Sequence, residues 1–178
     1  MTAEDGPLLR VGQGFDSHRF ARESAVAKPL VLGGVVIAGE PSLEGHSDAD
    51  AVAHAAADAL LGAAGLPDIG EQFPDSDPAL AGADSMGLLA QAVELVKATG
   101  FDVINLDTTV VCETPNLAVH LAAMRDNLAG TLGAPCNVKA KRPEQMGALG
   151  RGEGIACIAV ALIASRDAAG NGSINAAS

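Results

Sequence analysis

The chain is organised around the stretch His46-Ser-Asp-Ala-Asp-Ala-Val-Ala-His54, which opens a long segment rich in alanine and leucine. Both residue types favour helix, so we expect a helix over about residues 48–64. Asp50, His54 and Asp58 recur every fourth residue and therefore share one face of that helix. The helix dipole accounts for acidic residues in the first turn. It does not account for His54, which is therefore the first candidate functional residue.

A second candidate group lies near the N-terminus, in the stretch Arg10-Val-Gly-Gln-Gly-Phe-Asp-Ser-His18. Asp16 and His18 are two residues apart, so in extended backbone their side chains project to the same side. Together with His54 they offer one carboxylate and two imidazoles, a set that suits a catalytic zinc ion with its fourth position open. We expect Asp58, one helical turn beyond His54, to hold the other nitrogen of that ring.

Glycine and proline divide the rest of the chain into short segments with strand or helix character. A strand–helix–strand order in the second half predicts a right-handed crossover. The Pro/Gly/Asp-rich segment over residues 66–84 is expected to be functional, since long structureless loops are otherwise uncommon in compact domains. The predicted elements are a strand over 8–16, a hairpin over 29–38 broken at Gly33-Gly34, a helix over 85–99, a strand over 103–111, a helix over 118–131 and a strand over 136–140.

Length and composition predict one acidic domain. The 178 residues suffice for one domain with a real core, which we assign to residues 1–166. Residues 167–178 are rich in Ala, Gly, Asn and Ser, and we expect a disordered tail there. A net charge of −11 argues against binding to nucleic acid or to an anionic membrane. The same charge repels phosphate substrates, so local cations or metal ions must offset it.

The cysteines and the apolar segments predict a cytoplasmic location. Cys112, Cys136 and Cys157 are odd in number and lack C-x-x-C spacing, which indicates reduced thiols. The acidic start of the chain has no signal-peptide pattern. The most apolar run, over residues 154–165, is too short to span a bilayer.

Six motifs, in the same order along residues 10–164, closely resemble the 2-C-methyl-D-erythritol 2,4-cyclodiphosphate synthase family of the non-mevalonate isoprenoid pathway. Agreement over so many separate motifs is difficult to attribute to chance. The motifs are Gly12-x-Gly-Phe-Asp-x-His-Arg-Phe20, Leu32-Gly-Gly-Val35, Gly45-His-Ser-Asp-Ala-Asp50, His54-Ala-x-x-Asp-Ala-Leu-Leu-Gly-Ala-Ala64, Asp68-Ile-Gly-x-x-Phe-Pro-Asp75 and Gly150-Arg-Gly-Glu-Gly154.

The resemblance implies a fold and a reaction. The fold is an α/β (α+β two-layer) domain whose helices pack on one face of a mixed β-sheet that includes a strand over 154–165, assembled as a homotrimer with sites between subunits. In the reaction, the 2-phosphate of 4-diphosphocytidyl-2-C-methyl-D-erythritol 2-phosphate attacks its own β-phosphorus and expels CMP, as in a phosphorus–oxygen lyase. The attacking oxygen is already anionic, so the protein must supply positioning and charge neutralisation.

The resemblance also assigns cofactors and site residues. Zn²⁺ is expected on Asp16, His18 and His54, and Mg²⁺ or Mn²⁺ on Glu144. The catalytic set is His46, Ser47, Asp68, Asp75 and Glu144. The residues expected to bind the diphosphocytidyl substrate are Asp16, His18, His46, Ser47, Asp68, Gly70, Phe73, Asp75, Pro115, Asn116, Leu117, Lys141, Arg142, Glu144 and Arg151. Arg151 and Glu153 also resemble the residues that line the threefold axis of the family's trimer.

Two loops depart from the family pattern. The usual Pro-Lys of the cytosine loop is Pro115-Asn116 here, and the usual Thr-Thr-x-Glu of the phosphate loop is Lys141-Arg142-Pro143-Glu144. Both loops belong to the half of the site that the resemblance attributes to the neighbouring subunit. We expect Lys141 and Arg142 to bind phosphate through charge-assisted hydrogen bonds in place of the neutral bonds of threonine.

Other interpretations of these motifs remain to be tested. Gly45-His-Ser47-Asp-Ala49 imitates a hydrolase nucleophile elbow, with Asp107 and His120 following in the required order, although no strand directly precedes Gly45. Gly12-x-Gly14 hints at dinucleotide binding, but the third glycine is missing and no helix follows. Ser47 could instead be only a helix N-cap, and the loop aspartates only turn residues. A zinc-dependent phosphohydrolase and a non-catalytic trimeric binding protein complete the alternatives.

Overall fold

The structure is a computed structural model that describes residues 6–21, 28–74 and 82–166. Asp75 and the expected tail over 167–178 lie outside the described residues. The elements in chain order are β1 (Leu9–Arg19), β2 (Leu30–Leu32), β3 (Val35–Ile37), α1 (Ala51–Ala64), α2 (Ile69–Gln72), α3 (Ser85–Ala98), β4 (Phe101–Val111), α4 (Leu121–Leu132), β5 (Cys136–Lys141), α5 (Gly147–Gly150) and β6 (Gly154–Ser165).

The main sheet is mixed and has the strand order β1-β6-β4-β5, which confirms the predicted fold class. Strand β6 pairs antiparallel with both β1 and β4, whereas β4 and β5 are parallel neighbours joined through α4. The predicted strand–helix–strand crossover is therefore present. The short strands β2 and β3 form the predicted hairpin, separate from the main sheet.

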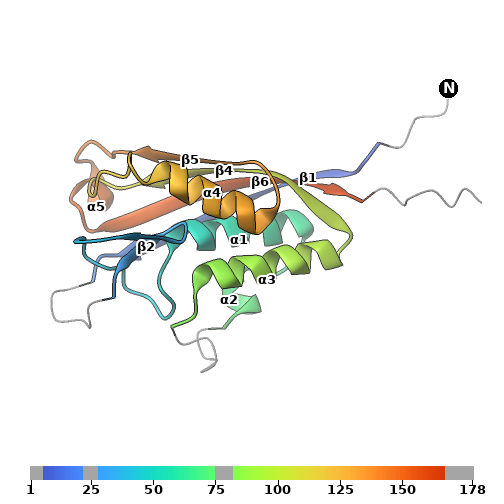
Figure 1. The fold of residues 1–178 in the computed structure, drawn as a ribbon, viewed down its shortest axis with the longest axis horizontal. Helices are drawn as coiled ribbons and strands as arrows, with labels where there is room; N and C mark the ends of the chain where they lie inside the picture. The colour runs from blue at the N-terminus through green and yellow to red at the C-terminus, as the bar shows by residue number, and fades with distance from the viewer. Residues whose placement is uncertain (1–5, 22–27, 75–81, 167–178) are drawn as a thin grey trace, which may run out of the picture.

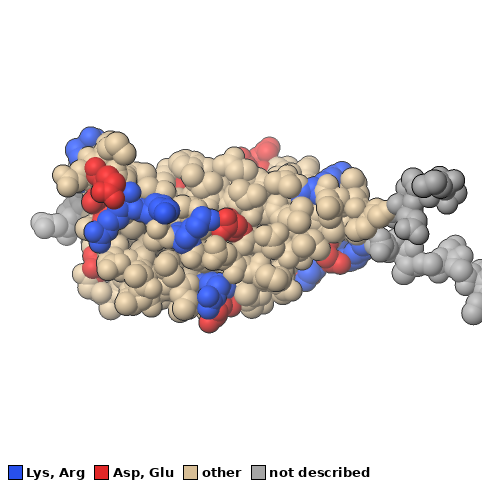
Figure 2. All heavy atoms as spheres, turned by 90° about the horizontal axis from the view of Figure 1, so that it is seen from above, with Lys and Arg blue, Asp and Glu red and all other residues tan. Residues whose placement is uncertain are grey.

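The helices cover one face of the sheet. Figure 1 shows the sheet along the top of the molecule, with α1 and α3 below it. Along β6 the side chains alternate as a strand with one covered face requires: Ile155 and Ile163 are completely buried, whereas Ile158 and Val160 are 41% and 42% exposed. Figure 2, which shows the molecule from above, has Lys and Arg side chains extending from the left end to the middle, where they meet an acidic group.

Helix α1 is the centre of the core and lies directly against β1. The approach is so close that a Cβ atom on Gly12 or Gly14 would come within 2.0 Å of the carbonyl oxygens of Ala59 and Ala55. The glycines of the Gly-x-Gly motif thus serve helix–strand packing, in which only glycine fits. This packing brings His54 on α1 over the end of β1 that carries Asp16 and His18.

The start of α1 differs from the prediction. The helix begins at Ala51 and Asp50 is its N-cap, so neither Asp48 nor Ser47 fills the expected position. Asp50 is fully buried, and its carboxylate accepts hydrogen bonds from Val52 and Ala53 of the helix. It also accepts from the backbone N–H groups at the hairpin tip, Gly33 at 2.8 Å and Gly34 at 2.7 Å. Asp50 therefore connects two elements and does not belong to an exposed helix face.

The remaining boundaries shift by a few residues. Strand β1 continues to Arg19, β4 begins at Phe101, and α4 begins at Leu121 because residues 113–120 form turns. The two four-residue helices α2 and α5 were not predicted. Among the described residues, no helix combines the length and the apolar character needed to cross a membrane. Burial raises the pKa of the Cys112 thiol to about 11 and that of Cys157 to about 12, so both thiols are poor nucleophiles.

Candidate metal centre

Asp16, His18 and His54 converge as predicted. Asp16 and His18 come from β1 and His54 from α1, and their nearest ligand atoms all lie within 4.8 Å of one another. Asp16 Oδ2 lies 2.9 Å from His18 Nε2 and 3.0 Å from His54 Nδ1, while the two imidazole nitrogens are 3.3 Å apart. The cluster is partly buried at the mouth of a cavity, so one side of it remains open.

The outer nitrogen of His18 is held by the backbone. His18 Nδ1 lies 2.8 Å from the carbonyl oxygen of Glu44. A carbonyl oxygen only accepts hydrogen bonds, so Nδ1 carries a proton, and in the neutral ring Nε2 then holds the lone pair on the side of Asp16 and His54. This is the arrangement that a metal-binding histidine requires.

The outer nitrogen of His54 is held by two hydroxyl groups. His54 Nε2 lies 2.8 Å from Ser85 Oγ, at the first residue of α3, and 3.2 Å from Ser47 Oγ. The predicted role of Asp58 is therefore wrong. Asp58 accepts a hydrogen bond from the backbone N–H of Ile69 at 2.8 Å and so anchors the start of α2, and burial raises its pKa.

The electrostatics of the cluster favour a cation. Burial alone would raise the pKa of Asp16, but the His18 and His54 rings beside the carboxylate outweigh it and hold that pKa well below its usual range. Burial lowers the pKa of His18, and the Asp16 carboxylate more than reverses this effect. A carboxylate and two imidazole nitrogens, facing one another at hydrogen-bond distance, form a donor set that fits zinc.

The cavity beside the cluster contains much of the predicted substrate site. Its volume is 230 Å³, and Phe73, Leu88 and Ile69 supply apolar walls. Of the predicted residues it brings together Asp16, His18, His46, Ser47, His54, Gly70 and Phe73. Asp68 is exposed and does not line this cavity; its side chain accepts from Glu71 N as the N-cap of α2, which is the role that turn chemistry alone predicts.

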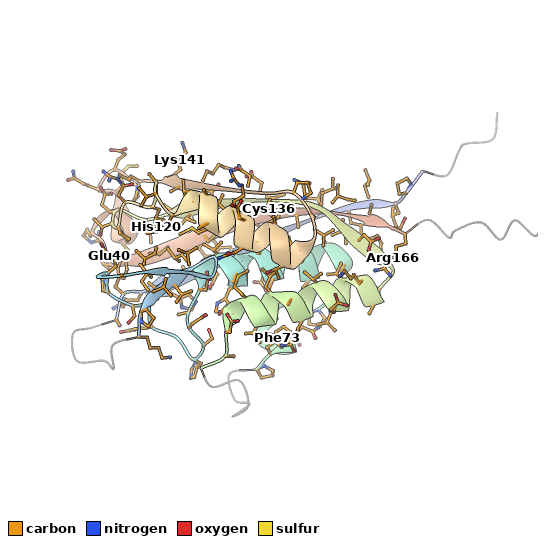
Figure 3. The ribbon with its side chains drawn as sticks, in the orientation of Figure 1. Glu40, Phe73, His120, Cys136, Lys141 and Arg166 are labelled. Carbon is orange, nitrogen blue, oxygen red and sulfur yellow. The ribbon has the colours of Figure 1, made fainter. Side chains whose placement is uncertain are left out.

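A second cavity contains the nucleotide half of the prediction. It has a volume of 170 Å³ and is lined by the predicted residues Pro115, Asn116, Leu117, Lys141 and Arg142, together with Cys112, Ala118, Leu121 and Ala140. It shares no lining residue with the metal cavity. Figure 3 shows this separation, with Lys141 beside the sheet and Phe73 below α3. The predicted site residues therefore fall into two separate cavities of one chain.

Glu144 and Arg151 line neither of these cavities. Glu144 is exposed in the loop after β5 and adopts a left-handed conformation with φ 53°, and its neighbour Gln145 does the same with φ 62°. Two successive left-handed residues without glycine are uncommon and often mark functional loops. Arg151 pairs with Glu153 at 2.7 Å.

The hydrolase interpretation is wrong in its choice of partners. Asp107 bonds to Asn137 and pairs with Lys139 on the neighbouring strand β5. His120 lies at the start of α4, whereas Ser47 contacts His54. Ser47, Asp107 and His120 therefore do not assemble into a triad.

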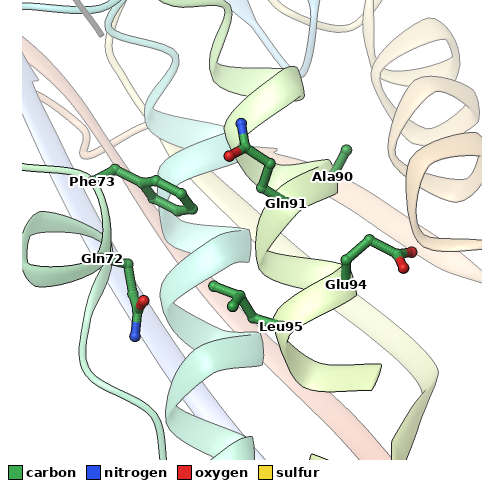
Figure 4. A pocket seen from close by; sticks show the side chains of 6 residues that line it. All are labelled: Gln72, Phe73, Ala90, Gln91, Glu94 and Leu95. Carbon is green, nitrogen blue, oxygen red and sulfur yellow. The ribbon is translucent and has the colours of Figure 1, made fainter. Parts of the chain in front are cut away.

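Among the described residues, a third cavity carries no cluster of metal-binding side chains. It has a volume of 570 Å³ and lies between α2 and α3, as Figure 4 shows. Its lining is Gln72, Phe73, Ala90, Gln91, Glu94 and Leu95, and Glu94 pairs with Lys97 at 2.8 Å. It touches the metal cavity only through Phe73.

Sequence reasoning missed Ser85 and Asp48 as partners of the metal cluster. Both lie at the starts of the helices predicted over 48–64 and 85–99, and a local pattern gives no sign that the start of α3 lies against His54. A search for a second hydroxyl or carboxylate near each ligand requires the tertiary structure.

Comparisons with known proteins identify the family of the chain. The family model described as the YgbB family matches residues 9–164. A curated 2-C-methyl-D-erythritol 2,4-cyclodiphosphate synthase of Laribacter hongkongensis is 53% identical over 161 residues, covering 89% of this chain and 97% of that protein. The synthase of Yersinia pseudotuberculosis is 51% identical over 158 residues, covering 87% and 96%.

Solved structures extend the similarity to the fold. The bifunctional IspDF of Campylobacter jejuni superposes with a TM-score of 0.85 at 41% identity, covering 91% of this chain and 44% of that longer chain. The CDP complex of Plasmodium falciparum IspF gives a TM-score of 0.75 at 30% identity, covering 89% and 97%. With a family match over most of its length and relatives at half identity, the chain belongs to the YgbB family, whose curated members named above are 2-C-methyl-D-erythritol 2,4-cyclodiphosphate synthases.

Proposed function

We propose that this protein cyclises 4-diphosphocytidyl-2-C-methyl-D-erythritol 2-phosphate to 2-C-methyl-D-erythritol 2,4-cyclodiphosphate and CMP. The observation that carries the proposal is the convergence of Asp16, His18 and His54 beside a cavity lined by His46, Ser47 and Phe73. The chain has this site within a sequence that is 53% identical to a synthase of that name.

The reaction balances without a protein nucleophile. An oxygen of the 2-phosphate forms a bond to the β-phosphorus, and the bond from that phosphorus to the bridging oxygen of CMP breaks. The electron pair leaves with CMP, and no proton has to be removed from the attacking phosphate. The protein therefore has to hold the two phosphates in line and to reduce their mutual repulsion.

The chain's own residues supply the positioning. Asp16 Oδ2, His18 Nε2 and His54 Nδ1 would hold a zinc ion, which supplies Lewis-acid polarisation of the β-phosphate. Ser47 and His46 border the open side of the cluster and orient the phosphate and the methylerythritol part. Asp68, from outside this cavity, would hydrogen-bond the erythritol hydroxyls, as the family resemblance implies, and Phe73 would exclude water from one wall.

The nucleotide part of the substrate belongs to the second cavity. Pro115, Asn116 and Leu117 would contact cytosine, Lys141 and Arg142 the diphosphate, and Glu144 a Mg²⁺ or Mn²⁺ ion. CDP is bound by the Plasmodium falciparum relative, as the description of that complex states. Since the two half-sites share no lining residue within one chain, a complete site requires a second copy to bring its nucleotide half to the metal half.

We propose a homotrimer as the assembly that unites the half-sites. The uncovered face of the sheet supports this proposal. Val11 is 69% exposed and Phe15 is 56% exposed on β1, next to the partly exposed Ile158 and Val160 of β6. Apolar side chains gathered on one sheet face indicate a surface that another protein chain covers. Cyclic symmetry repeats the same contact at every interface, so each copy can give one half-site and receive another.

The test is turnover of the diphosphocytidyl substrate by purified protein, followed by ³¹P NMR and chromatography. The proposal expects CMP and the cyclic diphosphate in equal amounts. An open-chain phosphate as product would identify a zinc-dependent phosphohydrolase, which uses the same ligands to activate water. Absence of any product in zinc-loaded protein would indicate a binding protein. Thr108→Val, which removes a buried hydroxyl outside both cavities, is the matched control and should turn over normally.

A further inference from the structure

A half-buried carboxylate and a buried hydroxyl form a pair behind the proposed metal ligand His54. Ser85 is 1% exposed, and its Oγ contacts His54 Nε2 at 2.8 Å on one side and the Asp48 carboxylate on the other. The backbone N–H of Ser85 also donates to Asp48 Oδ2 at 3.2 Å. The three residues thus form a continuous row from the loop before α1, through the first residue of α3, to the ring of His54.

Counting protons fixes the direction of these hydrogen bonds. A serine hydroxyl has one proton, and a carboxylate can only accept. Ser85 therefore donates to Asp48 and accepts from His54, so Nε2 of His54 carries a proton. In a neutral imidazole the other nitrogen, Nδ1, then holds the lone pair. Nδ1 is the nitrogen that faces Asp16 Oδ2 at 3.0 Å and His18 Nε2 at 3.3 Å.

We propose that Asp48 and Ser85 are positioning residues that select the metal-binding tautomer of His54 and fix the orientation of its ring. The inference rests on the proposed metal site and assigns it a support outside the ligands. A carboxylate acting on a metal-bound histidine through one hydroxyl is the longer equivalent of a direct carboxylate–histidine pair. Ser47 cannot replace this support alone, because it lies farther from Nε2, at 3.2 Å, and has no carboxylate behind it in the described contacts.

The pair is itself held firmly from both sides. Asp48 Oδ1 accepts from the backbone N–H of Asp50, and the N–H of Asp48 donates to the carbonyl oxygen of Ala83. Ala49, which lies between Asp48 and Asp50 in the chain, is fully buried in a left-handed conformation with φ 60°. A non-glycine residue adopts this conformation only where its surroundings require it. The packing of α3 against α1 is therefore coupled to the position of His54.

The first experiment measures zinc affinity by competition with a chromophoric chelator at fixed pH. We expect Ser85→Ala to weaken zinc binding by about 10–100-fold, the usual cost of losing the partner of a metal-bound histidine. Asp48→Asn should weaken it in the same direction. The double variant should bind zinc no more weakly than the more affected single variant, because Asp48 acts on His54 through Ser85 and the two effects do not add. Ser85→Thr keeps the hydroxyl and should recover most of the affinity.

The matched control is Thr108→Val. Thr108 is fully buried and its hydroxyl donates to the carbonyl oxygen of Asn137 at 3.0 Å, away from the cluster. This variant loses a buried hydroxyl as Ser85→Ala does, so its zinc affinity should equal that of the wild type. Zinc affinity of Ser85→Ala within twofold of this control would overturn the inference.

The second experiment reads the tautomer directly and needs no metal. In zinc-free protein at about pH 9, where imidazoles are neutral, ¹⁵N NMR of His54 should show mostly the Nε2–H tautomer. Ser85→Ala should shift His54 towards a mixture, while His18, whose partner is a backbone carbonyl, stays unchanged. Equal tautomer populations in wild type and Ser85→Ala would refute the inference. Wild-type protein that binds no zinc would refute the proposed metal site instead, and the tautomer measurement would still decide the role of Ser85.

Discussion

The two half-sites are built in different ways. The cluster of the metal half comes from β1 and α1, which leave no space for a side chain at Gly12 and Gly14, and a backbone carbonyl and a buried hydroxyl hold the two histidine rings. The cations of the nucleotide half, Lys141 and Arg142, are exposed at the end of β5 and in the loop beyond it. The cluster of the metal half is arranged within one chain, whereas the proposed role of the nucleotide half would depend on exposed charges and on a neighbouring subunit. Substitutions should therefore have larger effects in the metal half.

The largest effect is expected at His54. His54→Ala removes one of three metal ligands, so activity should fall to background and most of the zinc should be lost. The fold should remain, because His54 is partly exposed and the residues that pack α1 are alanines and leucines. Zinc content by atomic absorption and circular dichroism measure the two outcomes. His120→Ala, which changes a histidine outside both cavities, is the control. Full zinc occupancy in His54→Ala would show that another residue is the ligand.

Mixing two inactive variants tests whether the halves come from different subunits. His54→Ala lacks the metal half and Glu144→Ala lacks the second cation site, so each is expected to be inactive alone. After subunit exchange at equal amounts, one neighbouring pair in four combines both intact halves, and about a quarter of wild-type activity should return. Measured exchange without any recovered activity, or a monomer by light scattering, would contradict a shared site.

Substitution of Asp50, which supports the structure around the metal half, is expected to have an intermediate effect, on stability. Its buried carboxylate accepts four backbone hydrogen bonds from α1 and the hairpin tip, and an amide cannot accept all of them. Asp50→Asn should lower the free energy of unfolding by about 1–3 kcal/mol, measured in urea at one protein concentration. Asp126→Asn on the exposed side of α4 should change it by less than about 0.5 kcal/mol. Equal stability of the two variants would mean that Asp50 contributes nothing specific.

How much of this could be predicted from the sequence depends on the range of the interactions. The cluster of Asp16, His18 and His54 was predictable because strand and helix periodicity give the directions of these side chains locally. The partners of those ligands were not. Asp58 has the correct spacing for a partner of His54, but α2 takes its carboxylate, while Ser85 reaches the ring from 31 residues away. Helix propensity also placed the start of α1 too early, because the hydrogen bonds of Asp50 to the hairpin tip are long-range contacts that propensity does not include.

The same limit applies to the nucleotide half. The sequence shows that Lys141 and Arg142 replace two threonines of the family pattern, and the structure gathers them in one cavity with Pro115, Asn116 and Leu117. The local pattern contains no information on what lies opposite that cavity in an assembly. The contribution of these cations therefore has to be measured.

The smallest effect concerns these two cations and tests whether the nucleotide half acts through charge. Exposed charges contribute little in water, so Lys141→Thr/Arg142→Thr should weaken CDP binding only about fivefold at low salt. The decisive quantity is the salt dependence. Screening reduces charge–phosphate attraction but leaves neutral hydrogen bonds almost unchanged, so the wild type should lose affinity more steeply with added salt than the double variant. Isothermal titration across a salt series measures both. Lys97→Thr removes a cation that pairs with Glu94 on α3, and it should keep the wild-type slope. If the double variant binds CDP equally well and with the same slope, Lys141 and Arg142 do not touch phosphate, and cytosine contacts near Pro115 must account for the affinity of this half-site.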